Sequence, residues 1–254
     1  MSAQADLVKL SVGQFAERFR SEMIPLSSTF SYFCASVPMS EEELKEYLEE
    51  PIAALPQAIS AVLPKISIML VPYLERVDGK DKGQAGEYVS TERPPENRAF
   101  WASQVRLGDE EILFFALKDQ EVAEYHYRFY RMIASLIADR WSEEAQVSFS
   151  TLLREELHAG VHGEVDEESW HQKQSLLRRQ SNVRRETKAF REYAARSFID
   201  TMTLYLHGIC CDIDVETGPR QLPSRYLRRR LNLLYSLYPP PTGYAVLPEH
   251  QAER

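Results

Sequence analysis

The sequence predicts an α+β fold that is predominantly helical, with a small antiparallel three-stranded sheet in its first half. Two observations predict this class. Apolar and aromatic runs of strand length gather in the region 66–118. From Asp119 to Pro239, apolar residues instead recur at helical spacing. A chain of 254 residues can bury one large core, so we expect a single domain over 1–254.

The N-terminal part, residues 1–65, is expected to be helical. Ser40 and Glu43 have the spacing of a capping box, in which each side chain bonds the backbone N–H of the other residue. This pattern predicts a helix over about 41–49. The stretch 26–38 is aromatic and β-branched only in part, and we interpret it as a loop or a short strand.

The predicted sheet occupies residues 66–118. The apolar run Ile66–Tyr73 is typical of a buried strand. Gly108 and Asp109 form a turn signal between two apolar runs, which predicts a hairpin. Residues 78–97 are rich in glycine, proline and charge, so we expect a long loop there.

A helical body is expected over 119–238, followed by a tail over 239–254. In the first of its helices, apolar residues and His126 share one face. Serine or aspartate before an apolar run can cap a helix, because the side-chain oxygen accepts from an unpaired backbone N–H. The predicted helices are 120–139, one capped by Ser142, one capped by Asp166, one from Ser175 to about Leu206 with a break near Ser181 as the alternative, and one from Ser224 to Pro239.

Composition narrows the classes of function. The formal net charge is −8, which argues against a nucleic-acid partner because phosphate binding requires basic residues. The three cysteines lack the spacing of a disulfide framework or a zinc site, which favours a reducing, cytoplasmic setting. The longest apolar run is too short to cross a bilayer, so we expect no membrane partner.

The stretch 151–171 has the densest set of candidate metal ligands in the chain. Glu155, His158 and His162 follow one another at spacings of three and four, which places them on one face of a helix. Two histidines at this spacing can hold one metal ion, as in the HExxH motif of zinc hydrolases. The segment therefore suggests zinc or another divalent metal.

The general base of such a hydrolase is missing from its usual place. Ala159 stands where the motif has glutamate, so a different carboxylate, Glu164 in the first instance, would have to activate water. The alternative is that these residues form the solvated side of a helix whose Leu157 and Val161 are buried. An HxxxH pattern alone does not decide between them.

His126 lies on the apolar face of its own predicted helix. A lone histidine there is typically a core residue whose two nitrogens find hydrogen-bond partners. If its helix packed beside the one carrying His158 and His162, the three histidines would form a zinc set with an open fourth position.

Three further patterns have alternative explanations. Glu155–His158 and Glu168–His171 repeat the ExxH spacing of di-iron bundles, but they lie too close in sequence to face each other across a core. Alternating acids could bind a hard cation or form a surface turn. Clustered arginines could bind phosphate or pair with the acidic stretch. The acids are Asp212, Asp214 and Glu216, and the arginines are Arg178, Arg179, Arg184, Arg185, Arg191 and Arg228–Arg230.

Two hypotheses of function follow. The first is a non-enzymatic helical interaction protein, self-associating into a homo-oligomer through its acidic and basic faces. The second is a metal-binding protein or metal-dependent hydrolase with His158 and His162 as ligands, His126 or Glu155 as the third ligand, and Glu164 as the base. The first is favoured, because the sequence contains no complete catalytic set.

Overall fold

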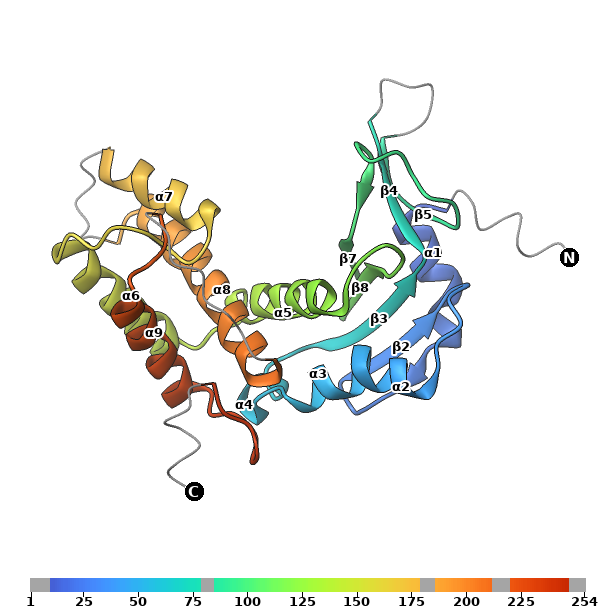
Figure 1. The fold of residues 1–254 in the computed structure, drawn as a ribbon, viewed down its shortest axis with the longest axis horizontal. Helices are drawn as coiled ribbons and strands as arrows, with labels where there is room; N and C mark the ends of the chain where they lie inside the picture. The colour runs from blue at the N-terminus through green and yellow to red at the C-terminus, as the bar shows by residue number, and fades with distance from the viewer. Residues whose placement is uncertain (1–9, 79–84, 179–185, 212–219, 247–254) are drawn as a thin grey trace, which may run out of the picture. The chain divides into compact units, whose positions relative to one another are not determined.

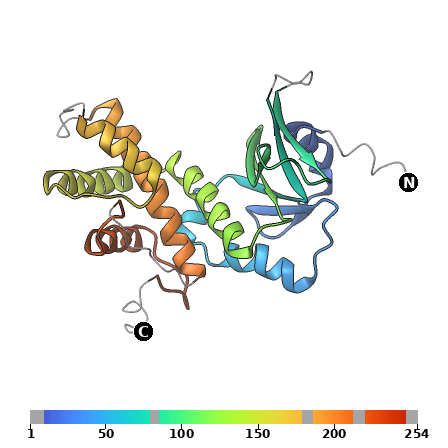
Figure 2. The same ribbon diagram turned by 45° about the horizontal axis from the view of Figure 1, so that its top comes forward.

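By its internal contacts, the chain separates into two compact units, which Figure 1 and Figure 2 show from two directions. Unit 1 comprises Met1–Glu50 and Leu63–Arg128, and unit 2 comprises Pro51–Val62 and Phe129–Arg254. All strands that the described residues form belong to unit 1. The structure, a computed structural model, describes residues 10–78, 85–178, 186–211 and 220–246.

The main sheet of unit 1 has five strands in the order β1-β2-β3-β8-β7 (Figure 1). The central strands β2, β3 and β8 are parallel, and β1 and β7 pair antiparallel at the two edges. Six consecutive residues of β3 and six of β8 are buried, as expected for parallel strands that are covered on both faces. The strands are β1 (Ile24–Pro25), β2 (Phe30–Cys34), β3 (Lys65–Val71), β7 (Ala102–Leu107) and β8 (Glu110–Ala116).

A second, antiparallel sheet in unit 1 has three strands in the order β5-β4-β6. It is formed by the chain between β3 and β7. Its strands are β4 (Tyr73–Val77), β5 (Gly86–Ser90) and β6 (Ala99–Phe100).

The prediction of one small antiparallel sheet over 66–118 was therefore wrong in part. The predicted strand corresponds to β3, and the hairpin is confirmed, because Leu107 pairs with Glu110 around the turn. However, β3 and β8 are parallel neighbours, and 78–97 contains β5. The continuous apolar runs of β3 and β8 are the signal of parallel strands, whereas the prediction relied on the turn alone.

Helices cover both faces of the main sheet. Phe15 of α1 (Val12–Phe19) packs on Phe114 with ring centroids 6.0 Å apart, on the face that also contains Met69. On the opposite face, Phe115 contacts Tyr125, which lies in α5 (Val122–Ala138). A 3₁₀ turn, η2 (Arg20–Glu22), follows α1.

The capping box predicted at Ser40 is confirmed. The Ser40 backbone N–H donates to Glu43 Oε2 over 2.7 Å, and the Glu43 N–H donates to Ser40 Oγ over 3.1 Å. Together they start α2 (Glu41–Leu44), which continues as a π-helical turn, η3 (Lys45–Glu49), and then as α3 (Glu50–Ala53).

Unit 2 is a helical body built around α8 (Lys188–Cys210). One face of this helix is buried from Phe190 to Ile209, and the helix packs against α6, α7 and α9. Ser142 caps α6 as predicted, because its hydroxyl accepts from the Ala145 N–H. The surrounding helices are α4 (Gln57–Ser60), the later part of α5, α6 (Glu143–His158), α7 (Glu167–Arg178) and α9 (Ser224–Leu237).

Of the two alternatives for the helix predicted from Ser175 to Leu206, the continuous one was wrong, because α7 ends at Arg178 and α8 begins at Lys188. The break expected near Ser181 lies outside the described residues. Among the helices of the described chain, none is both long and apolar enough to cross a membrane.

Candidate functional site

The helix that carries the predicted metal ligands ends earlier than their spacing requires. α6 ends at His158, and Gly160 then adopts a left-handed φ of +65°. His162 therefore lies beyond the helix, and the i, i+4 geometry of the two histidines does not form. Both imidazoles and Glu155 are exposed. His158 Nδ1 lies 2.7 Å from the carbonyl oxygen of Arg154.

The other predicted ligands have protein partners. Arg229 donates to Glu155 over 2.7 Å. His126 belongs to unit 1 and is buried, with its Nε2 2.9 Å from the Glu46 carbonyl oxygen. Within the described part of the chain, no group of three or more potential ligands includes His158, His162, Glu155 or Glu164. The metal hypothesis stays a prediction.

Glu164 was predicted as a base, and the structure places it in the core of unit 2. Gly163 turns the chain with a φ of +84°, after which Glu164 pairs through its backbone with the segment before α9. The Glu164 N–H donates to the Arg220 carbonyl over 2.9 Å, and the Leu222 N–H donates to the Glu164 carbonyl over 3.0 Å. This pairing directs the Glu164 side chain into the interior, where it is 0% exposed.

Two carboxylates share one arginine in this interior. Arg230 Nη1 donates to Glu164 Oε2 over 2.7 Å, and its Nη2 donates to Glu156 Oε2 over 2.5 Å. Lys173 Nζ donates to Glu164 Oε1 over 3.2 Å, and the Tyr193 hydroxyl donates to the same oxygen. We call this set the buried charge network: Glu156, Glu164, Lys173, Tyr193, Ser197 and Arg230.

The network holds Glu164 ionised. Burial by itself raises the pKa of this carboxyl, but Arg230, Lys173 and the Tyr193 hydroxyl outweigh it and lower the pKa to about 2. Burial also lowers the pKa of Lys173, and Glu164 offsets part of that effect. A carboxylate with so low a pKa is a weak base at neutral pH, because proton transfer works best when the pKa lies near the operating pH. The arrangement therefore acts as a structural connection among α6, α7, α8 and α9.

The acidic stretch pairs with arginines inside the chain. Of the clustered arginines named in the prediction, Arg229 and Arg230 pair with this stretch within the chain. Self-association stays a prediction. The exposed pairs are Arg229–Glu155 at 2.7 Å, Arg220–Glu167 at 3.1 Å and Arg196–Glu168 at 2.8 Å. Of the other predicted patterns, Arg179, Arg184, Arg185, Asp212, Asp214 and Glu216 lie outside the described residues.

Asp200 is a second buried carboxyl of unit 2. Its Oδ1 lies 3.0 Å from Arg131, while its Oδ2 has no hydrogen-bond partner among the described residues. Burial raises the pKa of Asp200 to about 6, and the negative charge of Asp166 adds to this. Ser169, Arg131 and Arg196 act in the opposite direction.

Asp200 should make unit 2 more stable as the pH falls from 7 to 4. The folded state binds a proton near pH 6 and the unfolded state near pH 4, so protonation in this window favours folding. We expect a gain of about 2–3 kcal/mol from this group. Urea titrations across the window should show the gain in the wild type and in an exposed control, Asp139→Asn. An Asp200→Asn variant with the same pH slope as the wild type would disprove the assignment.

Unit 1 contains a pocket at the carboxyl ends of β3 and β8. This carboxyl-edge pocket has a volume of about 290 Å³. Three aromatic residues line it, Tyr73, Phe100 and Trp101, together with the buried apolar residues Leu74 and Ala116. In open sheets with parallel strands, ligands bind outside the carboxyl ends of the strands.

Charged residues complete the lining. Asp119 follows β8 and adopts a left-handed φ of +63°, a conformation that aspartate tolerates better than most residues. Its Oδ2 lies 3.3 Å from Arg93 Nε and accepts from the Tyr73 hydroxyl over 3.3 Å. Among the described residues, Asp119 Oδ1 and the Glu96 carboxylate have no hydrogen-bond partner. Burial and the Asp119 carboxylate raise the pKa of Tyr73.

Each aromatic residue of the pocket also has a cation over its ring. Lys118 Nζ lies 5.8 Å from the Tyr73 centroid, Arg76 lies 5.0 Å from that of Phe100, and Arg128 lies 5.4 Å from that of Trp101. The sequence interpretation missed this pocket. The available signal was a polar or aromatic residue within three positions after each of two buried strands, Tyr73 after β3 and Asp119 after β8.

Comparisons with known protein families, with curated proteins and with solved structures find no match to this chain.

Proposed function

We propose that the protein is a non-enzymatic binding protein whose carboxyl-edge pocket takes a flat nitrogen heterocycle with an amino group, such as adenine or cytosine. The observation that carries this proposal is the combination of three aromatic residues with two unpartnered carboxylate acceptors in one small pocket. Its volume lies near the lower end of the range for small-molecule sites.

The ring-bound cations favour a neutral aromatic ligand over a cationic one. A cation is attracted to an aromatic face, but each of the three rings already has a lysine or arginine within 6 Å of its centroid. A further cation would be repelled by these charges. A neutral ring can stack on Trp101 or Phe100, which contributes about 1–3 kcal/mol for a nucleobase.

The acceptors select the polar edge of the ligand. Asp119 Oδ1 and Glu96 accept hydrogen bonds and cannot donate them when ionised. An exocyclic amino group donates two N–H bonds, whereas a carbonyl at the same position has none to donate. The pocket should therefore prefer adenine to hypoxanthine, which carries oxygen in place of the amino group.

Binding is favoured over catalysis because of what lines the pocket. Among the described residues that line it, none is a serine, cysteine or histidine, which are common nucleophiles and bases. The raised pKa of Tyr73 keeps its phenol protonated at neutral pH, and Arg93 forms an ion pair with Asp119.

The proposal is tested by titrating adenine and hypoxanthine into the wild type by calorimetry or ligand-observed NMR. Adenine should bind, and hypoxanthine should bind about tenfold more weakly, since a hydrogen bond to a charged acceptor contributes about 1.5–3 kcal/mol. The Asp119→Asn variant should lose a similar factor for adenine, because asparagine fits the same backbone conformation. Trp101→Leu should weaken both bases.

Asp109→Asn is the matched control, because it removes an exposed carboxylate of unit 1 that does not line this pocket. It should leave adenine binding unchanged. If the wild type binds no adenine at millimolar concentration, or if Asp119→Asn binds it as tightly as the wild type, the proposed function is wrong.

A further inference from the structure

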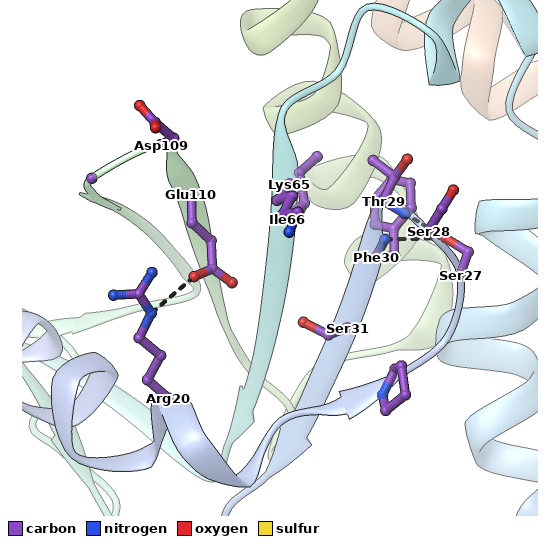
Figure 3. Close-up of a pocket in the computed structure, with 12 residues that line it drawn as sticks. Arg20, Ser27, Ser28, Thr29, Phe30, Ser31, Lys65, Ile66, Asp109 and Glu110 are labelled. Atoms are coloured by element: carbon purple, nitrogen blue, oxygen red, sulfur yellow. Dashed lines mark hydrogen bonds and ion pairs between the residues drawn. The ribbon is translucent and has the colours of Figure 1, made fainter.

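Unit 1 has a second, larger depression at the opposite edge of its main sheet. Figure 3 shows this amino-edge groove, where the parallel strands β2, β3 and β8 begin. Its volume is about 770 Å³, well within the range of small-molecule sites. The groove shares no lining residue with the carboxyl-edge pocket.

One wall of the groove is a fixed chain of hydrogen bonds. The Ser31 and Ser67 hydroxyls are 2.8 Å apart, and the Ser67 hydroxyl donates to Glu110 Oε1. Arg20 Nε donates to Glu110 Oε2 over 3.1 Å, as the dashed line in Figure 3 marks. Because both oxygens of Glu110 accept hydrogen bonds from within the protein, this wall is already organised before any ligand binds.

The loop opposite that wall is also held in place. The Ser27 hydroxyl oxygen accepts from the backbone N–H of Thr29 over 3.2 Å and of Phe30 over 3.0 Å. The Leu26 N–H donates to the Phe30 carbonyl over 2.9 Å. This turn places Ser28 and Thr29 along the groove (Figure 3).

Two charged side chains of the groove are not committed to protein partners. Lys65 is the first residue of β3, and Asp109 lies in the turn between β7 and β8. Both are labelled in Figure 3. Neither has an ion pair or side-chain hydrogen bond with any described residue. The Lys65 ammonium can only donate hydrogen bonds, and the ionised Asp109 carboxylate can only accept them. Together they can bind a ligand whose groups both donate and accept hydrogen bonds.

We infer that the amino-edge groove binds an uncharged polyhydroxylated molecule, a disaccharide of hexoses in particular. The lining has two cations and two carboxylates, so its formal charge is balanced, and neither an anion nor a cation gains from net attraction. Each sugar hydroxyl both donates and accepts, which matches a lining that mixes Lys65, Asp109 and serine or threonine hydroxyls. Because the groove is open to solvent, it suits a ligand that remains partly solvated.

The test uses the full chain and ligand-observed NMR with maltose, lactose, trehalose and sucrose at millimolar concentration. At least one disaccharide should show saturation transfer from the wild type. Lys65→Met and Asp109→Asn should each weaken that binding about tenfold, the effect of one hydrogen bond to a charged group. The exposed controls Lys45→Met and Asp78→Asn lie outside the groove and should not change it.

The outcomes separate this inference from the proposed function. Asp119→Asn should leave saccharide binding intact, because Asp119 does not line the groove. Absence of saturation transfer from all four disaccharides, or equal binding by Lys65→Met and the wild type, overturns the inference. Binding of inorganic phosphate that Lys65→Met abolishes would also overturn it, because the groove would then select an anion.

Discussion

Replacing Arg230 with methionine is expected to destabilise unit 2 by about 3–5 kcal/mol, because two buried carboxylates lose their shared cation. The side chains of Arg230, Glu156 and Glu164 are all 0% exposed, so water cannot replace the lost partner. Lys173 can offset only part of the charge, since it donates hydrogen bonds to Glu164 and to the Gly163 carbonyl. Urea unfolding followed by the fluorescence of Trp141 and Trp170 reports the loss, because both belong to unit 2.

The adjacent residue supplies the matched control. Arg229 also pairs with a glutamate of α6, but both side chains of the Arg229–Glu155 pair are about half exposed. Exposed pairs contribute about 0–1 kcal/mol, so Arg229→Met should change stability by less than about 1 kcal/mol. If the two methionine variants lose equal stability, the buried charge network does not stabilise unit 2 as described.

Neutralising the carboxylate that is left without a cation should restore part of the lost stability. Adding Glu156→Gln to Arg230→Met removes the unpaired charge and keeps the shape of the side chain, while Lys173 still pairs with Glu164. A double variant that is no more stable than Arg230→Met alone would show that lost packing, and not unpaired charge, is the cause. Lowering the pH weakens the buried charge network of the wild type, because it protonates Glu164. Because the folded-state pKa of Glu164 is about 2, its contribution is complete above pH 5 and is lost as the pH falls toward 2.

Helical periodicity contains the signal for this network, although the run of arginines hides it. Leu227, Leu231 and Leu234 form the buried stripe of α9, and Arg230 occupies a position on that stripe. Glu156 occupies the corresponding place on the stripe of α6 that includes Phe149. A charged residue on the apolar face of each of two helices predicts that the two charges pair. Which helices are neighbours, however, depends on tertiary packing that the periodicity does not contain.

Local signals predicted local structure well. The Ser40 capping box, the Ser142 cap and the Gly108–Asp109 turn each depend on residues within a few positions of one another, and the structure confirms all three. Sheet pairing depends on residues far apart in the sequence. The parallel register of β3 with β8 therefore could not be predicted from local patterns and is known only from the structure. The helical face inferred for His158 and His162 failed for a local reason, because the glycine between them ends the helix.

Gly163 is the position where a single methyl group should have the largest effect. A Cβ there would lie 2.1 Å from the Gln221 carbonyl oxygen and 2.5 Å from its carbonyl carbon. Both are backbone atoms, so no side-chain rotation relieves the contact. The φ of +84° adds a conformational cost of about 1–2 kcal/mol for any residue with a Cβ. Accommodating alanine requires the segment around Gln221 to move, and that segment pairs with Glu164.

We expect Gly163→Ala to destabilise unit 2 by at least about 3 kcal/mol, because the backbone clash adds to the conformational cost. Gly160→Ala isolates that cost, since Gly160 also has a positive φ of +65° but no atom within 4 Å of the added Cβ. Its loss should be about 1–2 kcal/mol. Hydrogen exchange adds a local measure, because the Glu164 and Leu222 amides donate across the pairing and should lose protection only in Gly163→Ala. Equal losses in the two variants would mean that the pairing beside Gly163 yields easily, and that Glu164 does not depend on it for its buried position.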